Sequence, residues 1–190
     1  MSRSSIARVL ALALAGSLAL CVGGGCKDDS SSAPKPAPSA AASGDLAIRS
    51  GSGVGLTFSY PEAYQLVVST ANPEANQIAI SSDKLPGVLT IRLNTVDPTG
   101  ALDLEQLAES SRVTMDPSGT IERTSMKVGT QAYPARSVHS TSLGLLPETD
   151  VLAVVPIGGR NYLITLHAAN EDVGKAARMF AVVLGSLKPG

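Results

Sequence analysis

The chain has 190 residues, with 15 basic and 16 acidic side chains and a net charge of −1. This near-neutral balance argues against nucleic-acid binding, which needs clustered positive charge to neutralise phosphates. Both cysteines lie within the first 26 residues, so a disulfide, a thiolate metal site and a cysteine nucleophile are excluded from the rest of the chain.

The first 25 residues are predicted to be a secretory signal peptide. Arg3 and Arg8 form a basic start, and the apolar run 9–20 that follows is about a dozen residues long. A membrane-spanning helix needs ~20 residues. No second long apolar run follows, so nothing after the signal is predicted to span a membrane. Without the two arginines, 13 basic residues face 16 acidic ones, a net charge near −3.

The stretch Val22-Gly23-Gly24-Gly25-Cys26 resembles the lipobox of bacterial lipoproteins, in which a small residue precedes the cysteine. It departs from that pattern in having glycine three positions before the cysteine, where an aliphatic residue is usual. The resemblance implies a diacylglycerol on the Cys26 sulfur and an acylated amine, with fatty chains of the palmitate kind. Two or three such chains anchor a protein stably to a bilayer. Cys21 is the competing candidate, but Leu20 before it is bulky. An ordinary signal peptide, cut elsewhere, would leave Cys26 as a free thiol.

Residues 26–54 are predicted to be a disordered, lipid-anchored linker. They are rich in Ser, Ala, Pro and Gly and have no apolar period. Such a segment reaches ~90 Å when extended and ~30 Å as a typical coil, so it would serve as a tether. The cluster Gly51–Gly55 resembles a phosphate-binding glycine loop only superficially, because no strand is predicted before it and no helix after it.

Residues 55–190 are predicted to form a single globular domain. Alternating apolar residues predict strands at 56–60, 64–68, 76–81 and 88–96. A helix follows from Asp103, which forms a capping box with Gln106, to about Thr114.

Four more strands are predicted at 120–128, 131–140, 151–157 and 160–168. Gly158-Gly159 would form a two-residue hairpin turn between the last two. A final helix is predicted to be capped by Asn170, with an apolar stripe of Val173, Ala177, Phe180, Leu184 and Leu187. Short turns between strands predict an α+β fold, a mostly antiparallel sheet with helices packed on its faces.

Several local patterns resemble the PsbP/Mog1/DcrB-like superfamily, over about residues 55–188. They are the F-x-Y-P-x-x-aromatic opening from Phe58 to Tyr64, Gly129 before the A-Y-P-A-R stretch 132–136, the G-G-R-N-Y turn 158–162, and a final helix ending in Ser-Leu-Lys. The resemblance implies an α/β/α sandwich with binding or assembly roles. The sequence departs from it in having no Trp, with Tyr64 where many members have one.

Catalytic and metal-binding patterns are weak. His139 and His167 would share a metal, with Asp150 or Asp172, only if their strands were neighbours, and two unrelated histidines are the favoured interpretation. No G-x-S-x-G motif accompanies the serines. The acid pairs Asp103/Glu105 and Glu171/Asp172 are explained by helix capping and the helix dipole. We therefore predict no enzyme activity, no cofactor and no metal.

Three residues are candidates for a binding surface: Tyr64, Arg136 and Tyr162. For the two tyrosines the alternative is packing in the core or at a sheet edge, and for Arg136 it is an ordinary ion pair.

The predicted function is a non-enzymatic, lipid-anchored protein of the cell envelope whose folded domain binds a protein partner or helps to assemble a complex. The alternatives are binding of a small molecule or an ion and, more distantly, a hydrolase. The resemblance to bacterial lipoproteins implies that an Asp after the cysteine would favour retention in the inner membrane, and here Lys27 follows Cys26. In a Gram-negative cell, the outer membrane is therefore expected.

Overall fold

The computed structural model describes residues 47–69, 76–94, 101–141 and 146–190. The predicted signal peptide, the predicted anchor at Cys26 and most of the predicted linker lie outside these residues. The elements are β1 (Ile48–Gly53), β2 (Leu56–Pro61), β3 (Gln65–Ser69), β4 (Gln77–Ser81), β5 (Val88–Leu93), α1 (Leu104–Met115), β6 (Thr120–Val128), β7 (Gln131–His139), β8 (Glu148–Ile157), β9 (Arg160–Ala169), the 3-10 helix η1 (Asn170–Asp172), α2 (Val173–Ser186) and β10 (Lys188–Pro189).

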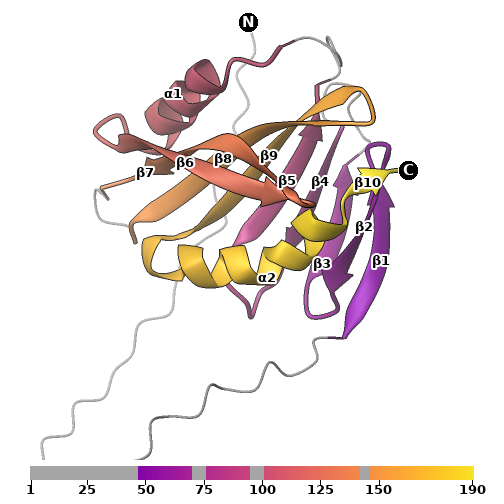
Figure 1. Cartoon of the computed structure of the whole chain (residues 1–190). Helices are drawn as coiled ribbons and strands as arrows, with labels where there is room; N and C mark the ends of the chain where they lie inside the picture. The colour runs from indigo at the N-terminus through magenta and orange to yellow at the C-terminus, as the bar shows by residue number, and fades with distance from the viewer. Residues whose placement is uncertain (1–46, 70–75, 95–100, 142–145) are drawn as a thin grey trace, which may run out of the picture. The chain divides into compact units, whose positions relative to one another are not determined.

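The domain is built on two antiparallel sheets (Figure 1). The larger has the strand order β3-β4-β5-β9-β8-β7-β6, and the smaller has the order β1-β2-β10. Helix α1 packs on one face of the larger sheet, while α2 and the smaller sheet pack on the other. The predicted α+β class, with helices on the faces of an antiparallel sheet, is therefore confirmed.

Strand β8 shows why the sheet is covered on both faces. Side chains alternate along a strand, so Ala153 and Val155 enter the main core beneath α2. Leu152 and Val154 face the other way, into a smaller cluster with Ala108 of α1. This agrees with the prediction that 151–157 is a covered central strand, although β8 begins earlier, at Glu148.

Two tight turns set the register of two hairpins. Gly158 and Gly159 have φ of 59° and 76°, as the predicted primed turn requires. The turn between β1 and β2 has the same form, with Val54 at φ 51° and Gly55 at φ 77°. The left-handed region is unfavourable for a β-branched residue, so Val54 is a strained position.

Strand β1 corrects the predicted extent of the linker, which included residues 48–53. The inner face of β1 carries glycines because there is no room for side chains. A Cβ on Gly53 would lie 2.5 Å from Ile78 Cγ2, and a Cβ on Gly51 would lie 2.8 Å from Phe58 Cε2. Alternating serine and glycine therefore makes a closely packed strand that has almost no apolar signal.

The two helices begin differently. The Asp103 carboxylate accepts hydrogen bonds from the backbone N–H groups of Glu105 and Gln106, at 2.9 and 3.2 Å, and so caps α1 as predicted. The prediction that Asn170 caps the last helix is wrong. Asn170 lies in η1, and its side-chain oxygen accepts a hydrogen bond from Thr149 Oγ1 at 2.6 Å.

The apolar stripe of α2 also differs from its prediction. Its fully covered positions are Ala176, Phe180, Val183 and Leu184. Ala177, which was expected on the buried face, is exposed. No helix within the described residues is long and apolar enough to cross a membrane.

Candidate functional site

Two of the three predicted surface residues belong to the core. Tyr64 is 2% exposed and Tyr162 is 1% exposed. The Tyr64 hydroxyl donates to the Pro86 carbonyl at 3.1 Å, and its ring centroid lies 4.8 Å from that of Phe180. The Tyr162 hydroxyl donates to the Val54 carbonyl at 3.1 Å. Burial raises the pKa of both phenols, so neither offers a binding surface and the packing alternative holds.

Arg136 forms an ordinary ion pair, as its alternative interpretation expects. Its guanidinium pairs with Glu105 of α1, with Nε 3.0 Å from each carboxylate oxygen. Nη1 also donates to the Ala135 carbonyl at 2.8 Å. The hydrogen bonds of the pair lower the pKa of Glu105 and raise that of Arg136. Arg136 therefore fastens α1 to β7, and it lies apart from both tyrosines.

The two histidines lie on opposite faces of the large sheet. His139 contacts Thr149, and His167 contacts Asp150, the next residue along β8. Neighbouring residues of a strand point to opposite faces, so the imidazoles cannot share a metal ion. Among the described residues no group of three or more His, Cys, Asp or Glu side chains could hold a metal ion.

His167 has carboxylate partners that the sequence interpretation missed. Its Nδ1 lies 2.7 Å from Asp150 Oδ1, and its Nε2 lies 3.7 Å from Glu148 Oε1. Ser111 of α1 donates to the other Asp150 oxygen at 2.7 Å. The hydrogen bond to Asp150 is the main reason that the pKa of His167 is raised.

A sequence signal for this pair exists in the hairpin itself. Asp150 lies eight residues before Gly158, and His167 lies eight residues after Gly159. A two-residue turn places such residues opposite each other, as the β8–β9 register shows. The predicted strand began at Val151 and so left Asp150 outside the hairpin.

A second polar chain connects the sheet to the start of α2. Thr149 Oγ1 donates to Asn170, so it accepts from His139 Nδ1, at 2.8 Å. His139 Nε2 is then the acceptor for Ser137 Oγ, at 3.0 Å. This order resembles a serine hydrolase relay, but a neutral hydroxyl stands where such enzymes place the carboxylate that stabilises the imidazolium. We assign this series of hydrogen bonds a structural role: it holds η1 against β8.

An apolar groove of about 330 Å³ runs between α2 and the edge strand β6. We call it the β6–α2 groove. Small and apolar side chains of α2 form one wall, backbone and side chains of β6 form the other, and a cross-strand pair from β8 and β9 forms the floor. The lining residues are Thr124, Ser125, Met126, Lys127, Val151, Leu166, Val173, Ala177, Ala181 and Leu184.

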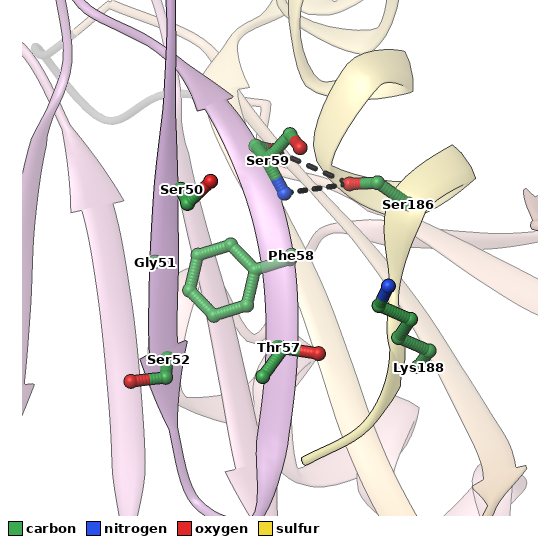
Figure 2. A pocket seen from close by; sticks show the side chains of 8 residues that line it. All are labelled: Ser50, Gly51, Ser52, Thr57, Phe58, Ser59, Ser186 and Lys188. Carbon is green, nitrogen blue, oxygen red and sulfur yellow. Dashed lines mark hydrogen bonds between the residues drawn. The ribbon is translucent and has the colours of Figure 1, made fainter.

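A second hollow, of about 470 Å³, lies on the outer face of the small sheet (Figure 2). We call it the hydroxyl-lined hollow. Five of its residues carry hydroxyl groups and one carries an ammonium group: it is lined by Ser50, Gly51, Ser52, Thr57, Phe58, Ser59, Ser186 and Lys188. Sequence patterns do not predict this hollow, because Ser50 and Ser52 fall in the predicted linker and Ser59 and Ser186 lie far apart along the chain.

No protein-family model matches the chain, and no curated protein matches it. Among solved structures, the chain is similar to cyanobacterial PsbP (CyanoP) from Synechocystis sp. PCC 6803, with a TM-score of 0.52 and 15% identity over 82% of this chain and 100% of that chain. It is also similar to the Ran-binding protein Mog1p of Saccharomyces cerevisiae, with a TM-score of 0.43 and 12% identity over 72% of this chain and 89% of that chain. The likeness to CyanoP confirms the predicted PsbP-like fold, and at 15% identity it concerns the fold alone.

Proposed function

We propose that this chain is a non-enzymatic binding protein of the cell envelope. In this proposal it is exported, tethered to a membrane by lipid on Cys26, and captures an extended segment of a protein partner in the β6–α2 groove. The observation that carries the proposal is the position of the groove. It is lined mainly by apolar side chains and runs beside a strand whose outer edge pairs with no other strand among the described residues.

The edge of β6 favours an extended occupant. An edge strand presents unpaired N–H and C=O groups, and an added strand satisfies them while its alternate side chains fill neighbouring pockets. Side chains of the added strand that point toward α2 would enter the space above Ala177 and Ala181. We therefore expect apolar residues at every second position of the bound segment.

The charge of Arg178 favours an acidic flank on that segment. Arg178 directly follows Ala177 on α2, and its side chain has no ion-pair partner within the described residues. Lys127 borders the groove through its place in β6, but it alternates with Met126, so its side chain points to the opposite face of the sheet. Complementary charge at the rim of an interface increases the association rate and the specificity.

A second copy of this chain is a poorer occupant. In an antiparallel pair of two β6 strands, directly opposite residues point to the same face of the joined sheet. Glu122 points to the face opposite that of Arg123 and Lys127, because side chains alternate. Glu122 of one copy therefore cannot lie opposite Arg123 or Lys127 of the other copy. The charges on β6 do not support this dimer.

The docking proposal can be tested with a photo-crosslinking residue at Thr124 in the full-length protein, in its native membranes. We expect one discrete adduct with an envelope protein. The same residue at exposed Lys84, in the loop between β4 and β5, serves as the control and should give no such adduct. Ala181→Trp should fill the groove and abolish the adduct while leaving the circular dichroism spectrum unchanged. Equal adducts from both positions, or an adduct that survives Ala181→Trp, would contradict the proposal.

The anchor is tested separately, by the mass of the mature N-terminal peptide. We expect a peptide beginning at Cys26 with a diacylglycerol and an amide-linked acyl chain, and we expect Cys26→Ala to release the protein from membranes. An unmodified Cys26 would refute the tether and leave the groove proposal standing.

A further inference from the structure

The four outward hydroxyls of the hydroxyl-lined hollow form a regular array. Ser50 pairs with Ser59 and Ser52 pairs with Thr57 across the β1–β2 ladder. Cross-strand partners lie about 5 Å apart and alternate residues along a strand lie about 7 Å apart. The small sheet therefore presents a patch of donors and acceptors with the spacing of neighbouring polar groups on a small ligand.

These hydroxyls are available to a ligand. Within the described residues, none of the four has a hydrogen-bond partner for its side chain. Ser186 differs, because its Oγ donates to the Val182 carbonyl at 2.8 Å and accepts from the Ser59 backbone N–H at 2.8 Å. Ser186 thus forms a fixed wall of the hollow, joining the end of α2 to β2 (Figure 2).

Lys188 gives the hollow its only charge among the lining residues. It lies opposite Thr57 in the β10–β2 pairing, and its side chain lies between β2 and the end of α2 (Figure 2). No carboxylate pairs with it among the described residues. An unpaired ammonium beside hydroxyl donors is suited to an oxyanion, since hydrogen bonds to charged groups are the strong ones.

The floor of the hollow is the backbone of β1 and β2. Phe58 alternates with Thr57 and Ser59, so its ring points to the opposite face, where it is 3% exposed and packs in the main core. The ring lies against Gly51, where a Cβ would come within 2.8 Å of it, and Figure 2 shows it between β1 and β2. A sugar carries several hydroxyl groups that each donate and accept, so it matches an array of Ser and Thr hydroxyls over a strand surface. A volume of about 470 Å³ lies within the range of small-ligand sites, ~300–1,000 Å³.

We propose that the hydroxyl-lined hollow binds an acidic sugar, with its carboxylate or phosphate group on Lys188 and its hydroxyls on the Ser/Thr array. The site is separate from the β6–α2 groove, and it adds a ligand to a protein proposed to bind another protein.

Saturation-transfer NMR with the full-length protein tests the assignment, using glucuronate, glucose 6-phosphate, glucose and inorganic phosphate as probes. We expect saturable binding of the two acidic sugars, with glucose and inorganic phosphate at least about tenfold weaker, as expected when a charge-assisted hydrogen bond or the hydroxyl contacts are missing. Equal binding of inorganic phosphate would overturn the sugar assignment. Equal binding of glucose would overturn the role of the oxyanion.

Variants connect the binding to the hollow. Lys188→Met should weaken glucuronate binding about tenfold, and Thr57→Val, which keeps the β-branched shape, should weaken it by a smaller factor. Lys175→Met, on α2 outside the hollow, is the matched control and should change nothing. Glucuronate binding that is absent from the wild type, or unaffected by Lys188→Met, would refute the proposal.

Discussion

The tight packing of β1 can be tested by adding a single methyl group at Gly53. The ideal Cβ position lies 2.5 Å from Cγ2 of Ile78, a fully buried side chain, and 3.5 Å from Cγ2 of Val68. Gly53 does not have a positive φ, so alanine fits the backbone and the steric effect is isolated. Either β1 or Ile78 must move, and overpacking of this kind costs about 1–3 kcal/mol. For a domain of this size that loss corresponds to a fall in Tm of about 3–12 °C.

Urea unfolding followed by circular dichroism measures the effect, since the chain has no Trp to serve as a fluorescent reporter. We expect a lower midpoint for Gly53→Ala with an unchanged slope, the mark of a stability change. Gly185→Ala in α2 is the matched control. Its Cβ meets nothing within 4 Å, so we expect it to be neutral or stabilising by up to about 1 kcal/mol. A Gly53→Ala variant as stable as the wild type would show that β1 does not pack as described.

Three further predictions concern strain and titration. Val54→Asn should stabilise the domain, because asparagine tolerates the left-handed φ of 51° and forms a favoured Asn-Gly turn with Gly55; thermal unfolding checks this, and a lower Tm would count against the strain. The raised pKa of His167 means that its bond to Asp150 contributes stability that is complete below the unfolded-state pKa of about 6.5 and is lost as the pH rises through the folded-state pKa. His167→Gln should therefore flatten the stability profile around neutral pH, and an unchanged profile would refute this. Asp116 accepts four hydrogen bonds from Ser118 and Thr141, which hold its pKa well below the usual range. The contribution of Asp116 to the free energy of unfolding is present above pH ~4 and falls on acidification. Asp116→Asn should therefore reduce stability at neutral pH and make that stability less sensitive to acid. Urea titrations at several pH values would show both effects.

Local alternation predicts a strand correctly where one face is apolar and the other polar. Strand β5 begins at Val88 as predicted, with Leu89, Ile91 and Leu93 buried and with Thr90 and Arg92 alternating with them. Gly158-Gly159 predicts its turn correctly, because the positive φ that the turn requires depends only on these two residues. Asp103 likewise identifies the start of α1, since a capping side chain bonds to its own helix.

Features that depend on contacts distant in sequence were not recoverable. Strand β1 was missed because its inner face is glycine, and the need for glycine comes from Phe58 and Ile78. The stripe of α2 was placed incorrectly because apolar character alone does not show which side the sheet covers. Strand β5 pairs with β9, far along the chain, and nothing local in either strand encodes that order. The groove and the hollow also depend on distant contacts, because one needs α2 beside β6 and the other needs Ser186 and Lys188 beside β2.

Helix α2 connects the two proposed sites. Whether binding at one site is coupled to binding at the other depends on how firmly α2 is fixed to the rest of the domain. Its middle lines the β6–α2 groove through Ala177 and Ala181, and its last residue, Ser186, lines the hydroxyl-lined hollow. The C-terminal end is fixed twice: Ser186 Oγ accepts from the Ser59 N–H at 2.8 Å, and the Leu184 carbonyl accepts from the Gly129 N–H at 2.9 Å. A ligand that meets only side chains of β1, β2 and β10 leaves both bonds intact. We therefore expect the two sites to be independent, so that saturating glucuronate leaves the crosslinking yield at Thr124 unchanged. A yield that changes with glucuronate in the wild type but not in Lys188→Met would show instead that α2 moves and transmits binding from one site to the other.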